Sequence, residues 1–84
     1  MNDKISFYPN PAFEHLKFRC STQVNRHFRV QFINSFGVKI NDFVLDFSTA
    51  ENEKNIYTGA LSPGIYVVMI EEGNKTQIEK LIIE

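Results

Sequence analysis

Apolar and polar residues alternate with a period of two along most of this chain, and that pattern limits the fold more than any other feature. The clearest case is Phe28, Val30 and Phe32, which alternate with Arg29 and Gln31. Side chains of a β-strand point alternately to the two faces of a sheet, so the spacing predicts strands with one buried face. Segments of this kind lie at 5–8, 16–20, 28–33, 38–47 (with a kink or bulge at Asn41 and Asp42), 56–58, 65–71 and 76–83. No long segment fits a helical period.

Residues 61–70 combine a turn with a strand. Pro63 fixes φ and Gly64 can adopt a positive φ, so a turn is expected there. The apolar run 65–70 that comes next is typical of a strand buried on both faces. Gly64 and Tyr66 resemble the corner of immunoglobulin-like sandwiches, in which a tyrosine bonds back to the preceding loop. The sequence therefore predicts an all-β fold, an immunoglobulin-like antiparallel β-sandwich of about seven short strands.

The length and composition predict one small domain. With 84 residues the chain buries about 60–65% of the surface that it exposes when unfolded, so it has little room for a deep catalytic cleft. Its 8 phenylalanines can still fill a core. We expect residues 1–4 to be a linker or an expression remnant without a signal peptide, and residues 5–84 to form the domain.

The charge pattern and the length of the apolar runs argue against two classes of partner. The formal net charge is -1, and the basic residues are scattered, which disfavours nucleic-acid binding. No apolar run approaches the roughly 18–20 residues that span a bilayer, so we expect no direct membrane insertion.

Few residues are candidates for chemistry, and none of them forms a recognisable site. Cys20 shares an alternating face with Leu16 and Phe18, so a packed, inert thiol is expected. His15 and His27 lack further ligands at strand spacing. The carboxylates are better interpreted as solvated surface charges. A calcium site at Asp42 and Asp46 would need more oxygen ligands than this loop offers. We expect Ser62 to form hydrogen bonds within its turn. We expect no enzyme activity, no metal and no cofactor.

Four ordered segments resemble a known family, the C-terminal sorting domains of the type IX (Por) secretion system. Tyr8-Pro9-Asn10-Pro11 is similar to the family's opening motif, and residues 30–37, ending at Gly37, resemble its strand and turn. Residues 61–68 resemble its "L-x-x-G-I-Y-x-V" segment, and residues 80–83 its closing basic and apolar strand. The motif positions are Tyr8, Pro9, Asn10, Pro11, Gly37, Leu61, Pro63, Gly64, Tyr66 and Lys80.

The resemblance implies a non-catalytic signal at the C-terminus of a larger cargo protein in Bacteroidetes-type bacteria. Type IX translocon and sortase components would be the protein partners, with the cargo covalently attached upstream. The cargo would transit the periplasm to a secreted or outer-membrane, cell-surface location, and a surface sortase would remove the domain.

The last strand is our candidate for recognition, through pairing of its edge with a receptor strand. Its residues are Lys80, Leu81, Ile82, Ile83 and Glu84. Pro9, Asn10 and Pro11 would fix the junction with an upstream linker that holds the cleavage site. We expect a monomer in which association through an edge strand is possible.

The alternative is an immunoglobulin-like or fibronectin-like spacer, or a carbohydrate-binding or adhesion module of a cell-surface protein. A carbohydrate binder would need an exposed aromatic platform, for which Tyr8, Tyr57 and Phe13 are the candidates.

Overall fold

The computed structural model describes residues 5–21 and 24–84. The expected linker at residues 1–4 and part of the expected loop at 21–25 lie outside the described residues. Seven strands make up the fold: β1 (Ser6–Tyr8), β2 (His15–Arg19), β3 (Arg26–Ile33), β4 (Lys39–Phe47), β5 (Glu53–Tyr57), β6 (Gly64–Glu72) and β7 (Lys75–Ile83). No helix of the described residues is long and apolar enough to cross a membrane.

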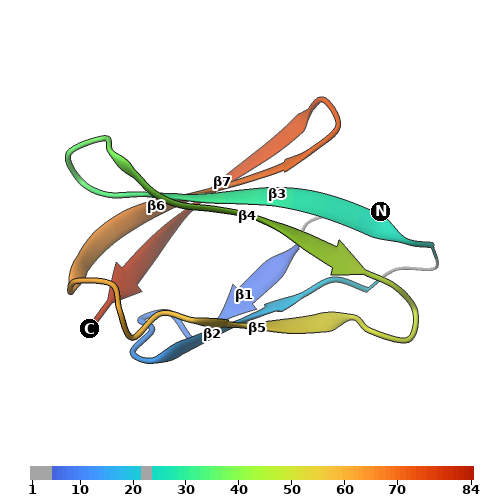
Figure 1. The fold of residues 1–84 in the computed structure, drawn as a ribbon, viewed down its shortest axis with the longest axis horizontal. Coiled ribbons are helices and arrows are strands. Elements are labelled where there is room, and N and C mark those ends of the chain that lie inside the picture. Colours follow the sequence, from blue (N-terminus) through green and yellow to red (C-terminus); the bar gives the residue numbers. More distant parts are fainter. Residues whose placement is uncertain (1–4, 22–23) are drawn as a thin grey trace.

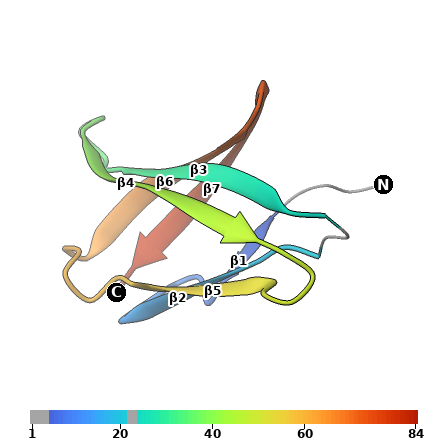
Figure 2. The ribbon, with the colours of Figure 1, turned by 45° about the vertical axis from the view of Figure 1, so that its right-hand side comes forward.

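The strands form two layers that face each other (Figures 1 and 2). One layer, the small sheet, has the strand order β1-β2-β5, and the other, the large sheet, has the order β4-β3-β6-β7. All strand pairs within the two sheets are antiparallel. The predicted all-β, antiparallel sandwich of seven strands is therefore confirmed.

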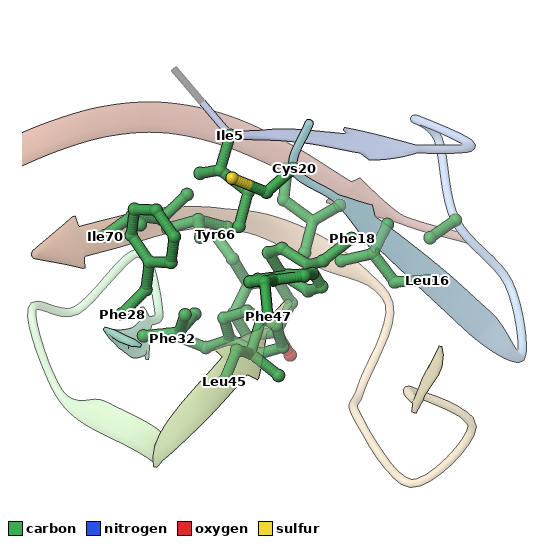
Figure 3. Close-up of a cluster of buried hydrophobic side chains, with 14 of the residues drawn as sticks. Ile5, Leu16, Phe18, Cys20, Phe28, Phe32, Leu45, Phe47, Tyr66 and Ile70 are labelled. Carbon is green, nitrogen blue, oxygen red and sulfur yellow. The ribbon is translucent and has the colours of Figure 1, made fainter. Parts of the chain in front are cut away.

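Alternate residues of both sheets point into one shared core. Phenylalanine rings connect the layers: Phe18 of the small sheet lies 6.3 Å from Phe43 of the large sheet, centroid to centroid, and Phe43 lies 5.5 Å from Phe32. Figure 3 shows Phe18, Phe47 and Tyr66 together in this cluster. Cys20 is buried in it, as the alternation predicts, and accepts a weak hydrogen bond from the Arg26 guanidinium. The residues at alternate positions of the period-two pattern are therefore those that form the buried face of each sheet.

The predicted tyrosine corner is present at the start of β6. The Tyr66 hydroxyl donates a 2.6 Å hydrogen bond to the carbonyl oxygen of Ser62, four residues earlier. Gly64 has a φ of 155°, which side chains rarely adopt, so glycine suits the bend into the strand. The bond ties the turn to a ring that is itself buried in the core.

Three details of the predicted strands are wrong. Ile65 and Val67 were expected to be buried, but they point away from the core and are 55% and 37% exposed, because no second layer covers the outer face of β6. β5 begins at Glu53 rather than at residue 56, because its polar residues pair with β2 at a solvent-exposed sheet edge. The irregularity in β4 falls at Ile40, one residue before the expected bulge, since Phe32 pairs with Asn41 and Ile33 with Lys39.

An ion pair between Arg26 and Glu72 lies at the end of the sandwich near the β6–β7 turn. Arg26 donates a 2.8 Å hydrogen bond from Nε to Glu72, and its guanidinium lies 5.0 Å from the ring centre of Phe28. Hydrogen bonding to Arg26 holds the pKa of Glu72 below its usual value. A groove of about 500 Å³ lies here, lined in part by Arg26, Phe28, Glu72 and Gln77.

Removal of the corner hydroxyl should destabilise the fold. We expect Tyr66→Phe to lower the free energy of unfolding by about 1 kcal/mol, because a buried ring loses its one hydroxyl bond to the Ser62 carbonyl. Urea denaturation measures the change. Tyr57→Phe, at an exposed tyrosine on β5, is the matched control and should have little effect. Equal losses in the two variants would show that the corner bond does not contribute.

Candidate functional site

The four motif segments come together at one end of the sandwich, although they are spread over the whole chain. The β3–β4 turn, the start of β6 and the C-terminus all lie on the left of Figure 1. The segment after β1 joins them there, through a parallel bridge between Ala12 and Ile83. This region, residues 8–12, 34–37, 61–66 and 80–84, is called the motif end.

The first and last motif segments are hydrogen-bonded to each other. The Asn10 side chain donates from Nδ2 to the Lys80 carbonyl oxygen (2.8 Å) and accepts from the Ile82 amide (3.0 Å). The Ala12 amide donates to the Ile82 carbonyl oxygen, and the Glu84 amide donates to the Ala12 carbonyl oxygen, both at 2.8 Å. Residues 9–12 are called the proline tie, and the Tyr8–Pro9 and Asn10–Pro11 peptide bonds are cis. The tie follows β1 within the fold and is bonded to β7, so the expectation that it forms the junction with an upstream linker is wrong.

The proline tie changes the expectation for the last strand. A receptor strand needs unpaired backbone groups along an edge, but the outward backbone groups of Ile82, the carbonyl of Lys80 and the amide of Glu84 are already bonded to Asn10 or Ala12. The free edge expected at residues 80–84 is therefore absent. Leu81 and Ile83 point into the core, whereas Lys80 and Ile82 point outwards. Recognition of this strand stays a prediction, now through its outward side chains.

The last segment also contacts the third motif. Gly64 pairs with Ile83 and Tyr66 pairs with Leu81 across the β6–β7 ladder. The corner at the start of β6 is thus fixed from two sides, by its own tyrosine and by the final strand. The proline tie, β7 and the corner form one continuous hydrogen-bonded unit.

The second motif contributes a turn and the wall of a hollow. Asn34 Oδ1 accepts hydrogen bonds from the amides of Phe36 and Val38, both at 3.0 Å, and Gly37 has the positive φ (81°) that the turn requires. A hollow of about 320 Å³ lies between this turn and residues 60–66. Phe36 is 89% exposed beside it. The hollow brings the second and third motifs to the same surface.

The other polar candidates are paired on strand faces. Asp42 accepts hydrogen bonds from Arg29 and Lys39, and the bond from Arg29 is the main cause of the low pKa of Asp42. Asp46 is hydrogen-bonded to His27. Within the described part of the chain, no group of three or more histidine, cysteine or acidic residues is placed to hold a metal ion. Ser62 contributes its carbonyl to the corner bond, as its turn position suggested.

Two contacts at the junction of the sheets were not predicted. Ala12 pairs with the last strand. The Gln77 side chain accepts from the Ile5 amide through Oε1 and donates from Nε2 to the Ile5 carbonyl oxygen (2.9 Å). The sequence offered one signal for the Gln77 contact, namely a polar side chain on the inward face of β7, in line with Leu81 and Ile83. Ala12 carried none, because its role is entirely in its backbone.

A family comparison decides the identity of the domain. A sequence profile described as a secretion system C-terminal sorting domain, the Por secretion tail, matches residues 6–84. The chain belongs to this family. It is therefore a sorting domain of type IX secretion, and the protein that carries it is secreted or exposed at the cell surface.

The fold has a solved relative. The chain is similar to part of the structure of dimeric latent PorU from Porphyromonas gingivalis, with a TM-score of 0.62 and 14% sequence identity. The match covers 94% of this chain and 9% of the PorU chain, and at this identity it supports the fold of the sorting domain alone. No curated protein matches the chain.

Loss of the hydrogen bonds of the proline tie should lower the stability of the domain. We expect Asn10→Ala to lower the free energy of unfolding by about 1–2 kcal/mol, because it removes two hydrogen bonds to the backbone of β7. Asn55→Ala, at an exposed asparagine of β5, is the control and should stay within about 0.5 kcal/mol of the wild type. Urea denaturation of both variants checks this. An Asn10→Ala domain as stable as the control would contradict the role assigned to the tie.

Proposed function

We propose that this domain is the part of a larger cargo protein that the outer-membrane translocon of the type IX system recognises. The observation that carries the proposal is the family match over residues 6–84, which spans the folded sandwich and all four motif segments. The convergence of these segments at the motif end supports it, since a folded surface rather than a linear tail then presents the signal.

The direction of the chain supports the same function. β1 runs toward the motif end and ends there at Tyr8, so the chain enters the domain on the other side, where Ile5 contacts Gln77. A cargo attached before residue 5 would leave the motif end facing away from it. The translocon would then reach the motif end while the cargo is still attached.

Removal of the domain by a surface sortase is the second part of the proposal. Ile5 is held by Gln77, and residues 9–12 are held by β7, so the first described residues belong to the folded unit. A protease that cuts extended chain would act upstream of residue 5. The domain itself would take no part in catalysis.

A spacer or carbohydrate-binding function has weaker support. Tyr8 and Tyr57 lie on β1 and β5, with β2 between them, and the Tyr8 hydroxyl donates to Glu53. The Tyr57 ring packs edge-on against His15. These exposed aromatics do not form one continuous platform.

The proposal predicts export of a passenger protein. We expect a secreted reporter fused to residues 1–84 to reach the surface or the medium of a type IX-competent host and to stay in the periplasm of a translocon-deficient strain. Cell fractionation and surface labelling measure this. Phe18→Asp, which places a charge in the core, is the unfolded-domain control and should abolish export.

Two results would contradict the proposal. Equal surface reporter in both strains would rule out recognition by the translocon. A released reporter that still carries the complete domain, as shown by its mass, would rule out removal by the sortase.

A further inference from the structure

One part of the outer face of the large sheet, over β6, β7 and the end of β3, is unusually apolar for a surface. Aliphatic side chains from the end of β3 and from β6 and β7 point away from the core and lie next to one another across the strand register, in which Ile33 pairs with Val67 and Met69 with Ile78. This surface is called the outer apolar face and comprises Ile33, Ile65, Val67, Met69, Ile78 and Ile82.

The outer face of the small sheet is different. It carries mostly polar and charged side chains, with two tyrosines: Ser6, Tyr8, His15, Lys17, Arg19, Glu53, Asn55 and Tyr57. Antiparallel sheets of a sandwich normally have one buried and one polar face, as the small sheet does. A contiguous apolar surface on one sheet alone is typical of an interaction site.

Lys80 lies at the β7 edge of the outer apolar face. It follows Ile78 and precedes Ile82 on the same side of β7, and it pairs with Val67 of β6. Other cations of the large sheet have acidic partners, such as Arg29 and Lys39 with Asp42, and Arg26 with Glu72. Lys80 makes no ion pair within residues 5–21 and 24–84. An ammonium group among aliphatic side chains gains a strong interaction only if a partner supplies the negative charge.

We propose that the outer apolar face, with Lys80 at its β7 edge, is the docking surface for a protein of the secretion machinery that presents a carboxylate beside apolar side chains. The proposal rests on the proposed function and names the surface through which it operates. The face adjoins the motif end through Ile65 and Ile82, which pair with each other. Because the proline tie covers the edge of β7 at the motif end, contact here is made through side chains.

A protein fits this face better than a membrane or a second copy does. Attraction to anionic lipid usually takes a cluster of about 4–8 basic residues, whereas Lys80 is a single cation here. A second copy would bring the same face against itself. Of the acidic groups on the outer face of the large sheet, Asp42 is already bonded to Arg29, Asp46 is hydrogen-bonded to His27, and Glu71 lies opposite Arg29. A foreign carboxylate is therefore the better match for Lys80.

The test uses the reporter fusion with changes on the exposed face. We expect Lys80→Glu and Ile78→Asp to lower surface reporter by at least about tenfold, because each places a negative charge where a carboxylate must dock. Lys80→Arg should retain export. Ile78 is 61% exposed, so its substitution should leave the fold intact, and Ile78→Thr keeps the β-branched shape as a second variant.

Matched controls lie on the opposite face of the sandwich. Lys17→Glu and Tyr57→Asp make the same kinds of change on the small sheet, at a half-buried and an exposed position, and should export within about twofold of the wild type. A photo-crosslinking residue at position 78 should capture an outer-membrane protein of the secretion machinery in exporting cells, whereas one at position 55 should not.

The outcomes separate this inference from the proposed function. If the wild-type fusion is not exported, the proposed function fails. If the wild type and Lys80→Glu are exported equally, the function stands and the docking surface is wrong. A dimer of the purified domain that Ile78→Asp dissociates, or Lys80-dependent binding to vesicles containing phosphatidylglycerol, would also overturn it in favour of a second copy or a membrane.

Discussion

The hydrogen bonds between the proline tie and the last strand are the constraint on which the rest of this structure depends. They join residues 10–12, which follow the small sheet's first strand, to an edge of the large sheet. They hold Lys80 and Ile82 in register with the tie, and this places Leu81 and Ile83 in the core. β7 in turn fixes the start of β6, where Tyr66 bonds to the loop before it. A single long-range contact thus organises three of the four motif segments.

The strand pattern could be predicted from the sequence because the main determinant of a half-buried strand is local. Phe28, Val30 and Phe32 all lie in the core, and Gly37 has the positive φ that its turn needs. The tyrosine corner was also predictable, since turn and ring are only four residues apart. Period-two alternation and turn chemistry act over a few residues, and both can be identified in a single sequence.

The remaining features depend on contacts between distant segments. Asn10 and Lys80 are 70 residues apart, and no local pattern pairs them. The prediction of a free edge on the last strand was wrong because the residues that cover this edge are distant in the sequence. The apolar run of β6 predicts burial on both faces, but a sequence cannot distinguish burial inside a domain from burial against a partner. Ile65 and Val67 were expected to be buried but are exposed, and their exposure leads to the proposed docking surface.

The most direct test of the central claim, that the proline tie closes the edge of the last strand, is amide hydrogen exchange of the wild-type domain resolved by residue. The account predicts that the amides of Ala12, Ile82 and Glu84 exchange as slowly as core amides of β6, because each donates a hydrogen bond within the tie. The amide of Ile78 faces the same edge beyond the tie and should exchange much faster. Exchange of Ile82 and Glu84 as rapid as that of Ile78 would contradict the account.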